Sequence, residues 1–318
     1  MIDRPRLSVL MPVYNGRAYL RAALDSVAAA LVPGIEILAI DDGSTDSSPL
    51  ILANHRSRLP LRVLTTARTG NWVANTNRLA SEASGRWLTI LHQDDVWHPD
   101  RLRRLLPVLD TDATMVAHPV DFIDPTGRKL GRWTCPLSTR VAGSGPSETL
   151  EHLLIQNFIG MPAPVFRREA FERVDGMDES MWFVADWDLW LKLASVGTTR
   201  YLPESLAGFR IHPESQTIAR GDRSDELRSQ FGAIFARHLP VWSARSPQVR
   251  RQVEWAARAS VAVNLALMAK VQGQLPRWGE VARGLAGCSS GGWRRLLRDA
   301  RLGERIASRL RLGMRRRA

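Results

Sequence analysis

The chain has 318 residues, 44% of them hydrophobic, and a net charge of +12 from 44 Lys and Arg against 32 Asp and Glu residues. This length allows one large domain plus a smaller one, and two cysteines exclude a disulfide framework. Because no run approaches the roughly 18–20 apolar residues that span a bilayer, and no signal-peptide core is seen, we expect a cytoplasmic protein whose basic charge attracts anionic partners.

The first part of the chain alternates short apolar runs with helical patterns. Strands are predicted over 7–13, 35–40, 61–65 and 86–91, and helices over 17–30, 45–56 and 72–83. This order is typical of an α/β protein with a mostly parallel sheet covered by helices on both faces. In such sheets ligands bind outside the carboxyl ends of the strands.

Two of the predicted strands end in paired carboxylates. Asp41 and Asp42 follow the second strand, and Asp94 and Asp95 follow the fourth. Carboxylates at one sheet edge suit Mg²⁺ or Mn²⁺, which substrate phosphates usually complete. The pairs therefore indicate a nucleotide-diphosphate site. The alternative is that Asp94 and Asp95 only cap the turn before a helix near Pro99.

The pattern changes in the second half of the chain. Short strands are predicted near 116–117 and over 120–123, a surface loop over 133–147, and helices over 148–157 and 186–194. Beyond residue 220 no strand is predicted, and helices are expected over 223–239, 247–271 and 274–286. We therefore expect two parts, an α/β domain over 1–218 and a helical C-terminal region over 219–318.

The end of the chain is strongly basic. From Trp293 onward it contains ten Arg residues and two acids, and Leu302, Ile306, Leu310 and Met314 recur every four residues. This pattern predicts a basic amphipathic segment over 293–318 that lies on an anionic membrane. The alternative is a helix that packs on the domain and turns its charged face to solvent.

Several motifs together resemble one known family. They are Ser8-Val9-Leu10-Met11-Pro12-Val13-Tyr14-Asn15, Ile40-Asp41-Asp42-Gly43-Ser44-Thr45-Asp46, Leu91-His92-Gln93-Asp94-Asp95 with Pro99-Asp100-Arg101-Leu102, Ala185-Asp186-Trp187-Asp188-Leu189-Trp190-Leu191, and, more weakly, Phe209-Arg210-Ile211-His212-Pro213-Glu214-Ser215. In this order they resemble the inverting family-two glycosyltransferases over about residues 7–215. The resemblance implies a GT-A fold and metal-dependent transfer of a sugar from a nucleotide-diphosphate sugar to a hydroxyl group.

The resemblance also implies a donor site. Pro12 and Tyr14 would line the base and ribose pocket, and Asp42 would accept a hydrogen bond from the base of a UDP-, dTDP- or GDP-linked sugar. Asp95 would ligate Mn²⁺ or Mg²⁺ beside Asp94. His212 would ligate the same metal, and Arg210 would pair with phosphate. Many relatives carry Asp where this chain has His92, which we expect to pack or to support the site.

On the acceptor side, the resemblance makes Asp186 the catalytic base. From the residues alone, Asp186 is interpreted as the N-cap of a helix. Many relatives carry Glu before this Asp, where this chain has Ala185, so the resemblance leaves Asp188 as the residue that would support the base. Trp182, in a predicted loop, would stack on the acceptor sugar. The basic end of the chain indicates a glycan or glycolipid acceptor of cell-envelope polysaccharide synthesis, at the inner face of the membrane.

Other classes of protein compete with this hypothesis. A nucleotidyltransferase of related fold needs a Gly- and Arg-rich phosphate loop, and Tyr14-Asn15-Gly16-Arg17 stands in its place. A basic protein that binds nucleic acid or membrane without catalysis is another alternative. No nucleic-acid module is recognised, so we expect no nucleic-acid partner. Retention of Asp42, Asp95 and Asp186 argues against an inactive binding domain.

Overall fold

A seven-stranded sheet forms the centre of the molecule. The computed structural model describes residues 4–137, 139, 143–212, 214–215, 224–271, 274–287 and 289–304. The sheet has the order β10-β6-β9-β4-β1-β2-β3. Its strands are β1 (Leu7–Val13), β2 (Ile35–Asp41), β3 (Leu61–Thr65), β4 (Trp87–Ile90), β6 (Met115–Ala117), β9 (Val165–Arg167) and β10 (Thr199–Tyr201). Only β9 runs antiparallel to its neighbours, which confirms the α/β fold with a mostly parallel sheet.

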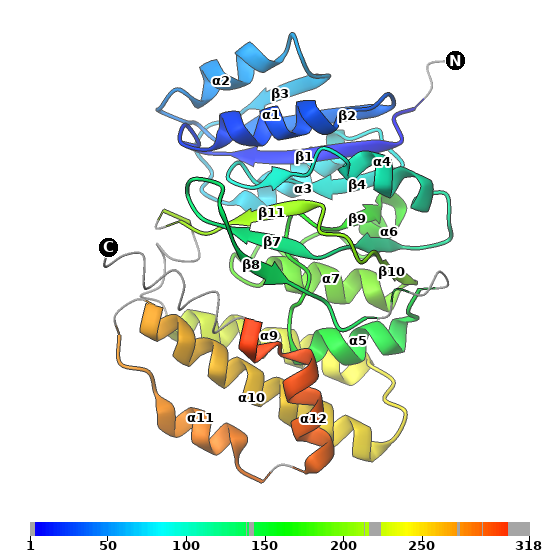
Figure 1. Ribbon diagram of the computed structural model, residues 1–318, viewed down its shortest axis with the longest axis vertical. Coiled ribbons are helices and arrows are strands. Elements are labelled where there is room, and N and C mark those ends of the chain that lie inside the picture. The colour runs from blue at the N-terminus through cyan, green and yellow to red at the C-terminus, as the bar shows by residue number, and fades with distance from the viewer. Residues whose placement is uncertain are drawn as a thin grey trace.

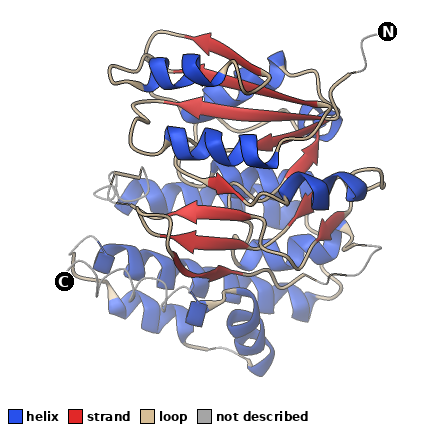
Figure 2. Cartoon of the chain, turned by 45° about the horizontal axis from the view of Figure 1, so that its top comes forward, coloured by secondary structure: helices blue, strands red, loops and turns tan. Residues whose placement is uncertain are grey.

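Helices cover both faces of this sheet (Figures 1 and 2). They are α1 (Leu20–Ala30), α2 (Ser48–His55), α3 (Trp72–Glu82), α4 (Arg101–Leu105), α5 (Pro146–Ile155), α6 (Arg168–Arg173) and α7 (Ala185–Ser195). Strands β1, β2 and β4 consist of almost continuous apolar residues, which suits their burial by helices on both faces of the sheet.

A second, four-stranded sheet lies beside the first and was not predicted. Its order is β5-β11-β7-β8, with β5 (Val96–Trp97), β11 (Ala207–Arg210), β7 (Val120–Ile123) and β8 (Lys129–Trp133). Only the 120–123 strand was expected from the sequence. This sheet matters for the site because β5 directly follows the Asp94-Asp95 pair and β11 carries Arg210.

Parallel pairing aligns the carboxyl ends of three strands. Val13 pairs with Asp41 between β1 and β2, and Leu10 pairs with Ile90 between β1 and β4. The ladder continues past the strands, since the Asp42 N–H donates to the Val13 carbonyl at 2.9 Å and the Leu91 N–H donates to the Leu10 carbonyl at 3.0 Å. Tyr14, Asp42 and the residues after Leu91 therefore share one edge of the sheet.

The C-terminal helices pack against the α/β part through a common apolar core. They are α9 (Ser224–Val241), α10 (Pro247–Val271), α11 (Trp278–Leu285) and α12 (Ser290–Asp299), and Figure 1 shows them at the end of the molecule away from β3. The Trp187 ring of α7 lies 5.9 Å from Phe231 and 6.2 Å from Phe235 of α9. None of the described helices is long and apolar enough to cross a bilayer.

The basic helix expected over 293–318 is interrupted. α12 ends at Asp299, and Arg301 has a positive φ of 47°, which stops the helix. Leu296 and Asp299 of α12 are buried against the rest of the protein. Of the predicted apolar stripe only Leu302 is described, since Ile306, Leu310 and Met314 lie outside the described residues.

A buried ion network ties α7 to α9. Asp188 is fully buried, and its carboxylate lies 2.8 Å from Arg237 Nη1, 2.8 Å from His238 Nε2 and 3.1 Å from Lys192 Nζ. These groups hold the pKa of Asp188 below its ordinary value despite burial. Asp188 therefore pairs with the C-terminal helices, and it does not support Asp186 as the sequence had suggested.

We expect Asp188→Ala to be among the most destabilising single changes. It removes the fully buried carboxylate that pairs with Arg237, His238 and Lys192. Breaking a buried pair costs about 3–5 kcal/mol and lowers Tm by about 5 °C or more for a chain of this size. Thermal unfolding monitored by fluorescence measures the change. The matched control is Asp110→Ala, whose ion pair with Arg6 is exposed and is worth under about 1 kcal/mol. Equal Tm values for the two variants would contradict a structural role for the network.

Candidate active site

The turn that follows β1 is hydrogen-bonded to the segment that follows β4. The Tyr14 N–H donates to Gln93 Oε1 at 2.8 Å, and Gln93 Nε2 donates back to the Tyr14 carbonyl at 2.9 Å. A Cβ at Gly16 would lie 2.6 Å from Gln93 Oε1, so a larger residue there would displace the Gln93 amide that holds Tyr14. Pro12 is buried within β1, two residues before Tyr14.

Asp42 is held by a ring of donors. Its Oδ1 accepts from the Thr69 N–H at 2.7 Å and the Thr69 hydroxyl at 2.8 Å, and its Oδ2 accepts from the Gly70 N–H at 3.0 Å and from Arg68. Asn75 of α3 also hydrogen-bonds to it. Burial alone would raise the pKa of Asp42, but these donors hold it below the ordinary value. Asp42 is therefore an ionised acceptor at the sheet edge.

Arg68 was not predicted as a site residue, yet it joins two that were. Its guanidinium lies 3.5 Å above the Tyr14 ring and pairs with Asp42. Stacking of this kind contributes about 0.5–1 kcal/mol at exposed sites. Arg68 is 39% exposed at its side chain whereas Asp42 is 3% exposed, so the arginine is the outer partner.

Three possible metal ligands gather where β4 ends. Ligand atoms of His92, Asp94 and Asp95 all lie within 4.8 Å of one another. Burial and the neighbouring Asp94 raise the pKa of Asp95 well above its ordinary value, because two carboxylates this close repel. Burial lowers the pKa of His92, so its imidazole is neutral and can act as a ligand.

These residues fit a divalent cation. The His92 Nε2 atom is buried and has no hydrogen-bond partner among the described residues. One imidazole and two carboxylates suit Mn²⁺, and the carboxylates alone suit Mg²⁺. A cation would also remove the repulsion between Asp94 and Asp95. His92 packs edge-on against Trp72 at 4.9 Å, as predicted, and its ligand atom also lies within the cluster.

Arg210 and His212 contact this cluster through Asp94 and Asp95. The Arg210 N–H donates to Asp95 Oδ1 at 2.9 Å, and its Nε donates to the Asp94 carbonyl at 2.8 Å. Its Nη1 donates to the carbonyls of Asp124 and Pro125. His212 Nε2 lies 2.9 Å from Asp94 Oδ2. Both residues expected at the diphosphate therefore contact the Asp94-Asp95 turn, and the Arg210 guanidinium is engaged by backbone carbonyls.

Asp186 lies in the first turn of α7. The N-cap position is Val184, so Asp186 is not the cap that its place in the sequence suggested. Its Oδ1 accepts from the Trp187 N–H at 2.7 Å, and its Oδ2 accepts from Asn157 Nδ2 at 3.0 Å. Burial raises the pKa of Asp186 to about 6 against these donors. The carboxylate is thus ionised above pH 6 and remains basic enough to accept a proton.

Asn157, which the sequence did not single out, orients this carboxylate. Its Oδ1 accepts from the Ile159 N–H at 3.1 Å, so the amide is fixed from both sides. No sequence signal marks it, because its partner is 29 residues away. Asn157 belongs to the segment that follows α5, and the neighbouring Gln156 accepts from Ser260 and Asn264 of α10, each at 2.8 Å.

We expect Asn157→Ala to shift the pH profile. Losing a donor to the ionised form raises the pKa of Asp186, so the acidic limb of kcat/KM moves to higher pH by up to about one unit. Asn157→Asp keeps the acceptor for Ile159 and adds a like charge, so it moves the limb in the same direction. The control is Asn54→Ala on the exposed side of α2. An unmoved limb in both Asn157 variants would exclude this coupling.

Trp182 lies between the metal cluster and the C-terminal helices. Its carbonyl accepts from Trp72 Nε1 at 3.1 Å, and the Trp72 ring stands edge-on to His92 at 4.9 Å. Its own Nε1 donates to Glu226 of α9 at 2.5 Å. The predicted acceptor residue is thus half-buried and fixed, and it lies one ring away from His92.

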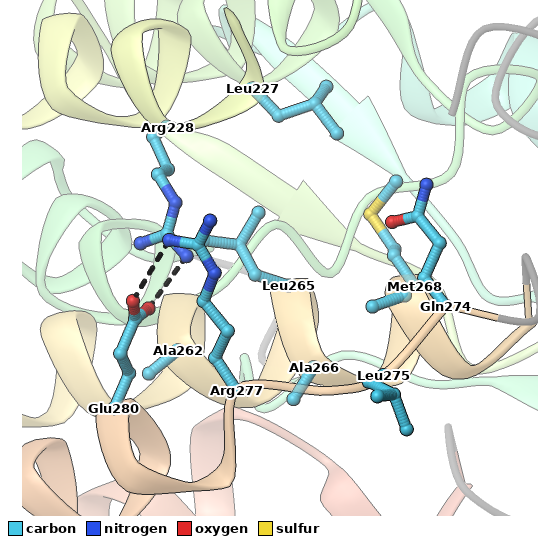
Figure 3. Close-up of a pocket in the computed structure, with 11 residues that line it drawn as sticks. Leu227, Arg228, Ala262, Leu265, Ala266, Met268, Gln274, Leu275, Arg277 and Glu280 are labelled. Atoms are coloured by element: carbon cyan, nitrogen blue, oxygen red, sulfur yellow. Dashed lines mark hydrogen bonds and ion pairs between the residues drawn. The ribbon is translucent and has the colours of Figure 1, made fainter. Parts of the chain in front are cut away.

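A cavity of about 190 Å³ lies elsewhere, between α9, α10 and α11 (Figure 3). It is lined mainly by Ala262, Leu265, Ala266 and Met268, and at its mouth Glu280 pairs with Arg228 and Arg277. Ligand pockets usually measure about 300–1,000 Å³. This cavity is too small for a nucleotide sugar and lies apart from the carboxylates.

Fold and site together define a GT-A glycosyltransferase. Residues 8–174 match the family model described as glycosyl transferase family 2. The chain belongs to that family, which confirms the resemblance noted in its motifs.

Relatives and solved structures agree. A protein of Nostoc sp. named as an uncharacterized glycosyltransferase is 31% identical over 238 residues, 71% of this chain and 72% of the relative. A Rickettsia prowazekii protein of the same description is 26% identical over 236 residues, 73% and 72% of the two chains. S. aureus TarS 1–349 with UDP-GlcNAc has a TM-score of 0.64 at 15% identity, covering 98% of this chain and 92% of that one. The Pyrobaculum calidifontis mannosyltransferase PcManGT with GDP-Man and Mn²⁺ has a TM-score of 0.57 at 20% identity, covering 97% and 87%.

Proposed function

We propose that the protein is a metal-dependent, inverting glycosyltransferase. It moves a sugar from a nucleotide-diphosphate sugar to a hydroxyl of a glycan or lipid-linked glycan in cell-envelope polysaccharide synthesis. One observation carries the proposal: His92, Asp94 and Asp95 cluster at the sheet edge that also presents Asp42 and Tyr14. That edge combines candidate metal ligands with an ionised acceptor for a base.

The donor base is assigned to Asp42 and Tyr14, with Pro12 beneath them. Five donors already surround Asp42, which offers about four lone-pair sites. A base N–H can therefore bind Asp42 only by replacing one of these donors. Arg68 is the donor that would be replaced, because the Thr69 and Gly70 N–H groups belong to the backbone. TarS has been solved with UDP and UDP-GlcNAc, and PcManGT with GDP-Man, which supports a UDP-, dTDP- or GDP-linked donor.

The diphosphate is assigned to the carboxylate cluster. Asp95, with His92 and Asp94, would hold Mn²⁺ or Mg²⁺, and PcManGT was solved with Mn²⁺. A cation bound there supplies positive charge against which a diphosphate can leave. His212 and Arg210 keep the Asp94-Asp95 turn in place. In this assignment Arg210 acts through that turn, and His212, whose Nε2 lies 2.9 Å from Asp94 Oδ2, is a further candidate ligand of the metal.

Asp186 is assigned as the catalytic base. Inversion requires one carboxylate that takes the proton of the attacking hydroxyl as it approaches the anomeric carbon opposite the leaving group. A pKa of about 6 leaves Asp186 mainly ionised at neutral pH, and Asn157 fixes its orientation. Trp182 is the candidate platform for the acceptor sugar, because it lies beside Trp72 next to His92.

The acceptor class follows from the charge of the C-terminal region. Ten of the Arg residues lie from Trp293 onward, which favours work at the anionic inner face of the cell membrane through residues 293–318. The same observation motivates the boundary near residue 218 between a catalytic domain and a membrane-directed helical region.

A donor screen tests the proposed function. Purified protein with Mn²⁺ or Mg²⁺ is incubated with UDP-, dTDP- and GDP-sugars, and release of nucleoside diphosphate is measured. We expect release from one donor class, and none above background for Asp95→Ala or Asp186→Ala. If the wild type and both variants turned over every donor at one background rate, the catalytic proposal would fail.

A further inference from the structure

The net charge of the chain is concentrated in its last part. Residues 247–318 hold 16 of the 44 Lys and Arg residues but 4 of the 32 Asp and Glu residues, which accounts for the whole +12. Residues 1–246 hold equal numbers of both signs. The attraction to anionic partners therefore belongs to residues 247–318.

Within the described part of this region, the acids are turned inward. The four acids, Glu254, Glu280, Asp299 and Glu304, are all at least partly buried and contact Arg250, Arg228, Arg298 and Thr134 respectively. Every fully exposed charged side chain described between 247 and 304 is Arg or Lys. The outer surface here is thus predominantly positive, since the three partly exposed acids, Glu254, Glu280 and Glu304, are paired with arginines.

Helices α11 and α12 pack on one stripe of α10. The Trp255 ring lies 5.6 Å from Trp293, and its Nε1 donates to the Ala286 carbonyl at 3.2 Å. One turn earlier on α10, Gln252 accepts from Arg295 at 3.2 Å, and one to two turns later Ala259 and Ala262 face Gly284. Positions three or four apart share one side of a helix. α11 and α12 therefore lie on the same side of α10, and their outer sides are those turned away from it.

Those outer sides combine large apolar side chains with arginines. Leu275 is 94% exposed, Trp278 55%, Leu297 62% and Trp293 38%. On α12, Arg294 and Arg298 are exposed beside Trp293 and Leu297, while Leu296 is buried on the opposite side. We call the set Leu275, Trp278, Arg283, Trp293, Arg294 and Leu297 the α11–α12 face.

The α11–α12 face is held rigidly. Glu280 binds Arg228 of α9 at 2.6 Å and Arg277 at 3.4 Å, which fixes the start of α11 (Figure 3). Asp299 fixes the end of α12 through His152 at 3.1 Å. Leu275 lies in the segment before α11 and Trp278 is the first residue of that helix, and no described residue covers either of them.

We propose that the α11–α12 face docks on an anionic lipid bilayer. Trp prefers the headgroup level of a membrane, exposed Leu gains from burial in the acyl boundary, and Arg is attracted to anionic headgroups. Nucleic acid would satisfy the arginines but would leave Leu275 and Leu297 in water, so lipid fits better. This inference rests on the proposed function for the lipid-linked acceptor, and it moves the contact from the whole 293–318 segment to a face that includes α11.

Vesicle co-sedimentation of the full chain tests the proposal. Phosphatidylcholine vesicles with and without phosphatidylglycerol are the probes. We expect binding only with the anionic lipid. Each cation near such a surface contributes about fivefold in affinity, so Arg283→Glu with Arg294→Glu should weaken binding by about 25-fold or more. Leu297→Asp should weaken it about tenfold, because burial of one Leu is lost.

Matched controls distinguish the face from overall charge. Leu50→Asp changes a Leu of the same 62% exposure on α2, and Arg56→Glu with Arg104→Glu changes two exposed arginines outside the C-terminal region. The proposal is overturned if these controls lose as much binding as the α11–α12 variants. It is also overturned if neutral vesicles bind equally well, or if duplex DNA binds more tightly and independently of Leu297.

Donor chemistry is measured in the same variants. Release of nucleoside diphosphate from a soluble donor should be unchanged in Leu297→Asp and in the arginine variants, because these residues lie outside the catalytic cluster. Loss of vesicle binding with normal donor turnover supports the face. If the protein bound vesicles normally but turned over no donor, the proposed function would be contradicted while the proposal of a membrane-binding face would stand.

Discussion

Asp186→Asn is expected to lower kcat by about 10³-fold, within the range for loss of a general base. Asn keeps the size of the side chain and the acceptor for the Trp187 N–H, so the fold and donor binding should stay close to those of the wild type. The effect should appear in kcat with little change in the KM for the donor, since the base acts on the acceptor hydroxyl. Steady-state kinetics with Asp112→Asn, an exposed Asp, as the control measure the change.

The pH dependence provides an independent readout of Asp186. Its pKa is raised to about 6 by burial, and only the ionised form accepts a proton. The wild-type kcat/KM should therefore fall as the pH drops through about 6, and this limb should vanish in the residual activity of Asp186→Asn. A limb that persists unchanged in the variant would assign the titration, and the role of base, to another group.

Asp95→Asn is expected to abolish metal-dependent turnover, with a loss of about 10³-fold or more, because charge stabilisation of a leaving group is usually the largest catalytic contribution. The amide oxygen still accepts from the Arg210 N–H. Asp94 and Asp95 repel each other when no cation is bound, so the variant should have the same Tm as the wild type or a higher one in EDTA. The substitution should therefore lower activity without lowering the stability of the fold.

Added Mn²⁺ separates the two effects. Ligands that bind the native state stabilise it by mass action, so Mn²⁺ should raise the Tm of the wild type and not that of Asp95→Asn. Asp100→Asn, an exposed carboxylate in the same loop region, should behave as the wild type. If Mn²⁺ raised the Tm of both variants equally, the ion would be binding elsewhere.

The long elements of the fold were predictable because their sequence patterns are local. The strand over 7–13 and the helix over 247–271 match their observed bounds, since continuous apolar runs and helical periodicity extend over many residues. β5, β9, β10 and β11 have two to four residues each, too few for a period to show. Their pairing depends on segments far away in the chain, so the second sheet could not be read from the sequence.

The site was predictable where motifs report it and not where tertiary contacts make it. Asp42, Asp94, Asp95 and Asp186 come from motifs at element ends, and their functional roles stay predictions. His92 stands in the same motif as Asp94 and Asp95, so its place near the ligands is local, but the contact of its ring with Trp72 could not be predicted from a local pattern. The same holds for Arg68, Asn157 and the bracing contacts of Arg210.

The central claim is that a nucleoside diphosphate binds at the edge formed by Asp42 and the His92–Asp94–Asp95 cluster with the help of a divalent cation. Calorimetric titration of UDP, dTDP and GDP, with Mn²⁺ and with EDTA, tests it most directly. We predict saturable binding of one nucleotide in the presence of Mn²⁺. In EDTA its affinity should fall by about 10-fold or more, which corresponds to about 1.4 kcal/mol. Asp95→Asn should show the same loss of affinity with Mn²⁺ present. Binding of equal strength in EDTA and in Asp95→Asn would contradict the account.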